Sequence, residues 1–220
     1  MLKRLFITLS IALFSVAAAS AQAVATDDYK KGEFFIGYSN GQVDTGLDSG
    51  SSVRDFFRDR ATFNGVNVSG VYNVNRYVGI KGDVSATFNG TRFSETFVNP
   101  GTTTTYTASF DTTNSLYNVV GGVQVKDNSR EGTVKPFAHA MVGLGHVRTK
   151  INDVVCTPVA LCPVTNDSFS DNGFTGVFGG GLDFRLNNTI QIRAIQLDYN
   201  PLWIGGQVDH NLRIGAGIVF

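Results

Sequence analysis

The chain has 220 residues, of which 42% are hydrophobic and 16% charged, and 18 Lys and Arg residues balance 18 Asp and Glu residues. The hydrophobic content and the zero net charge disfavour a disordered chain, and the balance of charges disfavours a nucleic-acid-binding protein, which would be basic. Outside the first twenty residues, no apolar run approaches the about 20 residues that a transmembrane helix requires. The length allows one sizeable domain or two small ones.

The N-terminus has the pattern of a secretory signal peptide over residues 1–21. Two basic residues precede an apolar stretch, Leu5–Val16, and small residues then run to Ala21. A basic start, a short apolar core and an A-x-A end predict cleavage after Ala21, with Ala23 as the second choice. The apolar core is short for the alternative, an uncleaved membrane anchor. Cleavage would leave residues 22–220 with 16 basic and 18 acidic residues, beginning with a short periplasmic segment at 22–32.

The only two cysteines lie close together in a segment rich in Pro, Val, Thr and Asn. In an exported protein such a pair usually forms a disulfide, so we expect a bridge between Cys156 and Cys162 that closes a small loop. A metal site is disfavoured because no histidine lies nearby to complete a ligand set.

Apolar and polar residues alternate along the mature chain, which is the pattern of β-strands with two different faces. One segment changes parity near Ala194–Ile195, where one extra residue in a β-bulge would restore the alternation. The sequence therefore predicts an all-β chain of eight strands, the first beginning at Phe34. The others are Gly65–Val74, Val78–Ala86, Leu116–Val125, Val134–Gly145, Phe174–Arg185, Ile190–Tyr199 and Asn211–Phe220.

Short and long connections alternate between these strands. The short ones are Asn75–Arg76, Lys126–Thr133 and Asn187–Asn188, and the long ones are Asp44–Phe63, Thr87–Asn114, Thr149–Asn172 and Pro201–Gln207. Outer-membrane barrels have short periplasmic turns and longer extracellular loops. The alternation therefore predicts an antiparallel up-and-down transmembrane β-barrel over residues 22–220, with both termini at the short-turn end.

Nine charged residues, five basic and four acidic, fall on the polar faces of these strands. A Lys or Arg facing lipid at the middle of the bilayer would cost about 2–4 kcal/mol, so we expect the polar faces to line the lumen. Because unpaired buried charges are costly, the near balance of charge fits a closed interior. Glu33 and Asp198 belong to these nine, and the predicted lumenal charge network comprises Lys81, Asp83, Lys135, His139, Asp183, Arg185, Arg193 and Arg213. The strand glycines Gly121–Gly122 and Gly179–Gly181 would leave room for these side chains and allow sharp curvature.

The end of the chain resembles the C-terminal assembly signal of bacterial outer-membrane proteins, with Gly215, Ile218 and the terminal Phe220 at the expected spacing. Ile214 departs from the polar residue that usually precedes the glycine. Segments Tyr77–Asp83, Lys135–His139 and Ile192–Tyr199 are similar to those of small OmpA-like, porin-family eight-stranded barrels. The resemblance implies a place in the outer membrane of a Gram-negative-type bacterium. It also implies contact with outer-membrane lipid, with lipopolysaccharide and, during insertion, with the barrel-assembly machinery.

Three functions remain open from the sequence, which shows no catalytic motif, cofactor site or metal site. The first is a structural or surface-interaction role, in which the long loops recognise a host or environmental ligand, because loops carry function on a rigid scaffold. The second is a narrow or gated pore with Lys81, Asp83, Arg185, Arg193 and Arg213 as its gating network. The third is a lipid A-modifying enzyme using His210. It is disfavoured because the adjacent Asp209 points to the opposite face of the strand.

Overall fold

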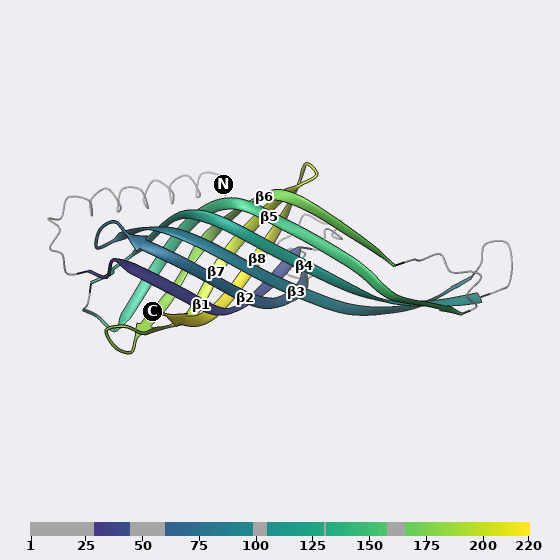
Figure 1. The fold of residues 1–220 in the computed structure, drawn as a ribbon, viewed down its shortest axis with the longest axis horizontal. Helices are drawn as coiled ribbons and strands as arrows, with labels where there is room; N and C mark the ends of the chain where they lie inside the picture. Colours follow the sequence, from purple (N-terminus) through teal and green to yellow (C-terminus); the bar gives the residue numbers. More distant parts are fainter. Residues whose placement is uncertain (1–28, 45–59, 99–104, 130, 158–165) are drawn as a thin grey trace, which may run out of the picture.

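The computed structural model describes residues 29–44, 60–98, 105–129, 131–157 and 166–220. Eight antiparallel strands follow one another around a closed barrel, and β8 pairs with β1 to close it (Figure 1). The strands are β1 Gly32–Asp44, β2 Arg60–Asn73, β3 Val78–Val98, β4 Thr105–Lys126, β5 Val134–Thr157, β6 Asp167–Arg185, β7 Gln191–Ile204 and β8 Gln207–Val219. The prediction of an eight-stranded up-and-down barrel is confirmed.

The predicted bulge is also confirmed. Opposite β8, Arg193 pairs with Gly217 and Gln196 with Gly215, so Ala194 and Ile195 together face a single residue. The register with β6 shifts at the same place. The extra residue returns Gln196 and Asp198 to the interior side of β7, where both are buried.

Two of the predicted long connections are largely strand, which corrects the sequence-based assignment. β3 and β4 pair from Val78–Val125 out to Val98–Thr105, through most of the expected loop 87–114. β5 and β6 likewise pair as far as Ile151–Asp167, within the expected loop 149–172. Thr, Val and Phe in these segments favour extended backbone, and pairing within each hairpin continues the sheet beyond the point where the barrel alternation is clear.

The connection Pro201–Gln207 is a tight turn and not a long loop, so the strict alternation of short and long connections is wrong at this point. β7 runs to Ile204 and pairs there with Gln207 of β8. Gly205 and Gly206 have φ values of 58° and 82°. Positive φ at both central residues is the requirement of a type I′ hairpin turn, which glycine meets without strain.

The two faces of the barrel wall differ as the alternation requires. Aliphatic side chains such as Ile80, Val119 and Leu144 point outward and are exposed, Leu144 to 68%. Polar and charged side chains of the same strands point inward and are buried. Since the outward band is apolar, this surface suits contact with acyl chains. No helix capable of crossing a membrane occurs among the described residues.

The strand glycines divide between the two faces. At the inward positions Gly122, Gly179 and Gly181, an added Cβ would run into the backbone of the neighbouring strand. These glycines therefore permit the tight curvature of a small barrel, as predicted. Gly121 instead points outward, where an added Cβ would meet only the carbonyl oxygen of Lys81, at 3.8 Å. The prediction of a lumenal role is thus wrong for Gly121 and also for Gly180, which shares the outward side of β6 with exposed Phe178 and Leu182.

Four strands continue beyond the rest of the wall and form what we call the protruding sheet. β2 pairs with β3 only as far as Asn64–Phe88, and β7 pairs with β6 only as far as Trp203–Phe174. Beyond these limits β3, β4, β5 and β6 remain paired with one another, and Figure 1 shows them extending from the end of the barrel opposite the C-terminus. The protruding sheet comprises Asn89–Val98, Thr105–Ser115, Arg148–Thr157 and Asp167–Gly173.

An aromatic belt marks the boundary between the barrel and the protruding sheet. Phe88 packs edge-on against Tyr117 with ring centroids 5.8 Å apart, and Tyr117 lies 6.0 Å from the ring of His146. Further round the wall, Phe174 lies 5.6 Å from Trp203. Aromatic belts of this kind sit at the membrane interface, so the protruding sheet extends into water on the outer side.

Candidate functional site

Among the described residues, the barrel interior contains nine buried Lys, Arg, Asp and Glu side chains and one buried histidine. At the periplasmic end, Lys126 Nζ donates hydrogen bonds to Glu33 Oε1 and Oε2 at 2.9 and 3.0 Å, to Asp183 Oδ2 at 2.8 Å and to Gln191 Oε1 at 2.9 Å. The side chains of Lys126 and Asp183 have no solvent exposure. Five basic and four acidic side chains make up the set: Glu33, Lys81, Asp83, Lys126, Lys135, Asp183, Arg193, Asp198 and Arg213, together with His139.

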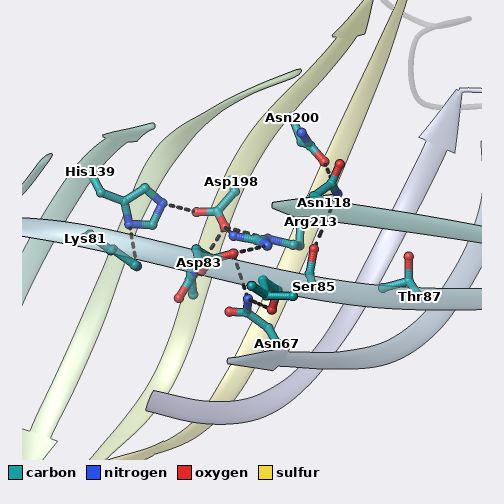
Figure 2. A network of polar contacts seen from close by, with 12 residues as sticks. Asn67, Lys81, Asp83, Ser85, Thr87, Asn118, His139, Asp198, Asn200 and Arg213 are labelled. Carbon is teal, nitrogen blue, oxygen red and sulfur yellow. Dashed lines mark hydrogen bonds and ion pairs between the residues drawn. The ribbon is translucent and has the colours of Figure 1, made fainter. Parts of the chain in front are cut away.

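A second group lies at mid-barrel and centres on Arg213, as Figure 2 shows. Its guanidinium donates to Asp198 Oδ2 at 2.8 Å and to Asp83 Oδ1 at 2.9 Å, bridging β3 and β7 across the interior. His139 Nε2 lies 2.9 Å from Asp198 Oδ1, and Lys81 Nζ lies 3.1 Å from His139 Nδ1. Because a carboxylate only accepts, Nε2 carries the hydrogen, and Nδ1 accepts from the lysine.

Arg193 joins the two groups into one network. Its guanidinium donates to both oxygens of Asp183 at 2.8 and 3.1 Å and to Gln196 Oε1 at 2.8 Å. Gln196 in turn donates to Asp198 Oδ2 at 2.7 Å. The guanidinium also lies 4.0 Å from the ring centroid of Phe137 and 4.4 Å from that of Phe35. Arg193 and Arg213 are thus each placed by partners on two other strands or strand segments, and this kind of pairing and hydrogen bonding is the condition under which burial of ion pairs is tolerated.

The structure places the predicted network residues unequally. Lys81, Asp83, His139, Asp183, Arg193 and Arg213 lie in the connected network just described. Lys135 is buried but donates to the backbone carbonyl oxygens of Asp127 and Ser129 at 2.9 and 2.6 Å. Arg185 is half-buried at the end of β6 and has no ion pair among the described residues.

Sequence reasoning missed Lys126, which has two ion-pair partners, as many as Arg213. The sequence pattern predicts Lys126 in a turn, whereas it is the last residue of β4 and points inward. Its parity with Gln124 and Gly122 was the signal that could have placed it. Glu33 and Asp198 are predicted strand charges outside the predicted network, but Glu33 pairs with Lys126 at its periplasmic end and Asp198 pairs with Arg213 at mid-barrel.

In the outer half of the barrel interior, the buried side chains next to Arg213 are polar, and those closer to the outer mouth are apolar. Asn118 Nδ2 donates to Ser85 Oγ at 3.3 Å and to Asn200 Oδ1 at 3.2 Å. The cavity beside these side chains and Arg213 has a volume of about 10 Å³, which is room for about one water molecule. Further out, buried Phe63, Leu116 and Leu202 pack together across the mouth of the barrel. Side chains therefore fill this half of the barrel.

The segment that precedes β1 crosses the periplasmic mouth and contacts all three periplasmic turns. The buried Tyr29 donates its hydroxyl to the carbonyl oxygen of Val74 at 3.0 Å, in the β2–β3 turn. Lys30 donates its backbone N–H to Asn128 O at 3.1 Å in the β4–β5 turn and its ammonium to Thr189 O at 3.1 Å in the β6–β7 turn. We call Tyr29–Lys31 the N-terminal strap.

The two faces of the protruding sheet have different chemistry. The inner face, which continues the barrel interior, carries Phe93 stacked on Phe110 with centroids 5.5 Å apart. The outer face, which continues the lipid-facing wall, carries Arg92 with its Nε 3.7 Å from Asp111 Oδ1. Arg148 and Lys150 share that outer face, as do Tyr117 and His146 nearer the membrane. The described basic side chains of the protruding sheet thus lie on its outer face.

The remaining predicted sites are placed as follows. Cys156 is buried near the end of β5, whereas Cys162 and Ala21 lie outside the described residues, so the disulfide and the cleavage site stay predictions. Ile218 and Phe220 point outward, and the backbone of Phe220 exchanges two hydrogen bonds with Phe34 of β1, at 2.8 and 3.0 Å. Gly215 pairs with Ser39. The residues of the predicted assembly signal are therefore part of the seam that closes the barrel, and their role in assembly stays a prediction.

Neither a metal centre nor a catalytic set stands out in the described part of the chain. These residues include no group of three or more His, Cys, Asp or Glu side chains that could hold a metal ion. The ring of His210 stacks on that of Tyr199, with Nδ1 and the phenol oxygen 2.5 Å apart. His210 is thus part of the aromatic belt at the outer end of the barrel wall.

Comparison with known proteins agrees with this architecture. A family model described as the outer membrane protein beta-barrel domain matches residues 8–220. The crystal structure of Ail, the attachment invasion locus protein of Yersinia pestis, in complex with the heparin analogue sucrose octasulfate, has 19% identity and a TM-score of 0.51. The match covers 87% of this chain and 100% of that one. Neisserial surface protein A (NspA) has 12% identity and a TM-score of 0.51, with 86% and 96% covered.

At these identities the solved structures show a shared fold alone. A comparison with curated proteins gives no significant match. The family match, by contrast, covers nearly the whole chain and agrees with the closed eight-stranded barrel and its apolar outer wall. The chain therefore belongs to the outer membrane protein beta-barrel domain family, which places it in the outer membrane of a Gram-negative-type bacterium.

Proposed function

We propose that this protein is a closed barrel that anchors the protruding sheet outside the cell as a surface for contact with a host or environmental macromolecule. The observation that carries the proposal is the unequal height of the wall: β3, β4, β5 and β6 stay paired well beyond the aromatic belt, while β2 and β7 leave the sheet near Phe88 and Phe174. Extra paired strand in water contributes nothing to spanning the bilayer. Its regular pairing makes it a rigid platform, and rigid platforms suit recognition.

Three features of the interior support a closed barrel over a pore. Ion pairs, joined through the hydrogen bonds of Gln196, run from Glu33 to Asp83 along the middle of the barrel. Apolar side chains around Leu116 fill the outer mouth, and the N-terminal strap crosses the periplasmic mouth. Opening a water-filled path would require breaking several buried ion pairs and their hydrogen bonds at once.

Planar-bilayer recording of the purified protein tests this part of the proposal. Wild-type protein is expected to stay silent at all applied voltages. Steady openings that change when Arg213→Gln neutralises the central cation would instead establish the pore. Arg92→Gln, on the outer face of the protruding sheet, is the matched control because it also removes one Arg charge but leaves the interior intact.

Attachment of whole cells tests the recognition part. A variant in which a short turn replaces 91–112 of the β3–β4 hairpin keeps the barrel pairing up to Asn89–Asn114. We expect it to insert normally and to lose attachment to surfaces or host cells that the wild type supports. Equal attachment by the two proteins at equal surface density would contradict the proposal.

The basic residues of the outer face fit a second partner already present in the membrane. Arg148 and Lys150 follow His146 on the same face of β5, in the direction away from the membrane, and so lie close to the level of the headgroups in the outer leaflet. We propose that they contact lipopolysaccharide phosphates, which Lys and Arg bind well. The amount of lipopolysaccharide that co-purifies with the protein should fall in an Arg148→Gln, Lys150→Gln variant.

We also propose that the barrel-assembly machinery binds the C-terminal strand during insertion. We propose no enzymatic activity, and the mass of lipid A should be unchanged on expression.

A further inference from the structure

The inner face of the protruding sheet has the clearest unexplained chemistry in the molecule. Cross-strand pairing places odd-numbered residues of β3 and β6 on the face that continues the barrel interior, together with even-numbered residues of β4. The odd-numbered β5 residues up to Ile151 share it. The described members in the middle of this face are Thr91, Phe93, Glu95, Phe110, Thr112, Thr149, Ile151, Asp167, Phe169 and Asp171.

Large apolar side chains on this face are exposed although they lie beyond the membrane. Phe93 is 43% exposed and Phe169 58% exposed. From the spacing of about 4.8 Å between strands and about 3.3 Å per residue, the two rings lie roughly 20 Å apart, with Phe110 and Ile151 between them. An exposed apolar surface of this extent on a water-facing sheet usually marks an interaction site.

Charge is sorted between the two faces of the sheet. Glu95, Asp167 and Asp171 are exposed on the inner face, which has no Lys or Arg among the residues described above. Arg92, Arg148 and Lys150 lie on the outer face, where Asp111 is the one acidic side chain among the described residues that pairs with them. The inner face therefore combines carboxylates with aromatic rings, and both of these groups attract cations.

Several occupants do not fit this chemistry. The inner face continues the barrel interior, so it faces away from lipid. A second copy of the same face would oppose carboxylate to carboxylate, and a sulfated polyanion would also be repelled. The connecting segments of this chain supply no excess of positive charge: residues 45–59 contain Asp48, Arg54, Asp55, Arg58 and Asp59, and residues 99–104 and 158–165 contain no charge.

Addition of a partner strand to the β6 edge is also disfavoured. The backbone N–H of Ser168 donates to Asp167 Oδ1 at 2.7 Å, and that of Asn172 donates to Asp171 Oδ1 at 2.7 Å. Side chains of β6 itself thus occupy edge donors that an added strand would need, a common protection of exposed sheet edges. The face of the sheet is therefore a better site than this edge.

We propose that the inner face of the protruding sheet binds a basic polypeptide segment that carries apolar side chains, with its cations on Glu95, Asp167 and Asp171 and its apolar groups on Phe93 and Phe169. The inference rests on the proposed external recognition role and names the chemical class of the partner. It separates the two faces by function: the outer face meets anionic headgroups, and the inner face meets a cationic protein.

The test uses the full-length protein in nanodiscs of zwitterionic lipid. The probe is a fluorescent twelve-residue peptide of alternating arginine and leucine, with an alternating glutamate and leucine peptide as its control, and anisotropy gives Kd at low and high salt. We expect the arginine peptide to bind at least about tenfold more tightly than the glutamate peptide. We also expect its binding to weaken as salt screens the contacts.

Two inner-face variants and one outer-face variant locate the site. Glu95→Gln with Asp171→Asn, and separately Phe93→Ser with Phe169→Ser, should each weaken binding about tenfold. Arg92→Gln with Arg148→Gln should leave Kd within about twofold. These positions are exposed, so the variants should fold, and retained heat-dependent mobility of the folded barrel on gels verifies that they do.

Two results would overturn the inference. One is equal binding by the wild type and both inner-face variants, and the other is a preference for the glutamate peptide. If the hairpin truncation abolishes cell attachment while the inner-face variants retain it, the partner class is wrong and the recognition role stands. If neither change affects attachment, the recognition role fails as well.

Discussion

Replacing Lys126 with methionine should destabilise the barrel strongly, because a single ammonium group neutralises two acidic side chains in a dry interior. Lys126 Nζ lies within 3.0 Å of four acceptor oxygens, on Glu33, Asp183 and Gln191. Methionine keeps most of the side-chain volume but removes the charge and all four hydrogen bonds. Asp183 keeps its contact with Arg193, whereas Glu33 has no other described salt-bridge partner.

The expected loss follows from the buried environment. Breaking a buried ion pair by removing one partner costs about 3–5 kcal/mol, because the remaining charge stays desolvated. At about 1.4 kcal/mol for each factor of ten, the unfolded fraction should rise by about one hundredfold to a few thousandfold. The double variant Lys126→Met, Glu33→Gln removes the stranded charge as well, so it should lose less than the sum of the two single variants by about 0.5–3 kcal/mol.

Reversible urea unfolding in lipid vesicles, followed by tryptophan fluorescence, measures these free energies. Trp203 lies in the outer aromatic belt and reports the transfer from bilayer to water. Lys150→Met is the matched control: it makes the same substitution on the protruding sheet, outside the described network, and should change stability by less than about 0.5 kcal/mol. A loss of less than 1 kcal/mol in Lys126→Met, or strict additivity in the double variant, would refute the reasoning.

Three further predictions use the same unfolding assay. Arg76 holds the pKa of the Asp127 carboxyl at about 2 through hydrogen bonds of 2.9 and 3.1 Å. Because this pKa is lower than the value near 4 in the unfolded chain, the contact stabilises the fold fully at pH values above about 4. That stabilisation is lost as the pH falls from about 4 to 2. Since the pair is on the surface, Asp127→Asn should cost at most about 1 kcal/mol at pH 7 and nothing below pH 2, and an equal cost at both pH values would contradict this. Gly206→Ala should cost about 1–2 kcal/mol because its φ is 82°, while Gly205→Asn, a residue that tolerates positive φ, should cost less; equal costs would argue against the type I′ turn. Met141→Ala should cost about 2–5 kcal/mol by opening a cavity beside Val120 and Val177, whereas the outward-facing Val142→Ala should cost clearly less. A larger loss of stability in Val142→Ala than in Met141→Ala would contradict the assignment of the odd-numbered β5 residues to the interior.

Much of the fold followed from local pattern. Alternation at period two identified all eight strands, and the parity change at Ala194–Ile195 located the bulge, because one extra residue necessarily flips every side chain that follows. The same parity would have placed Lys126 inside the barrel had β4 been extended by one residue. Loop lengths were harder to predict, since Thr-, Ser- and Gly-rich segments can form either loops or strands.

Partner assignments within the candidate site could not be read from the sequence. Glu33 and Lys126 are separated by 93 residues, and Asp83 and Arg213 by 130. Alternation fixes that these side chains point inward, but it does not fix which of them meet. The protruding sheet was likewise invisible, because its existence depends on β2 and β7 leaving the sheet earlier than their neighbours.

The sequence by itself determined the class of molecule: an exported chain whose strands each carry an apolar face for lipid and a polar face for the interior. That property is local, since neighbouring side chains on a strand always point to opposite sides. Only the tertiary structure decided that ion pairs, apolar side chains and the N-terminal strap fill the barrel, and that four strands rise together beyond the membrane. Both outcomes depend on closure between β1 and β8 and on the register between strands, which set distances across the barrel that no local pattern encodes.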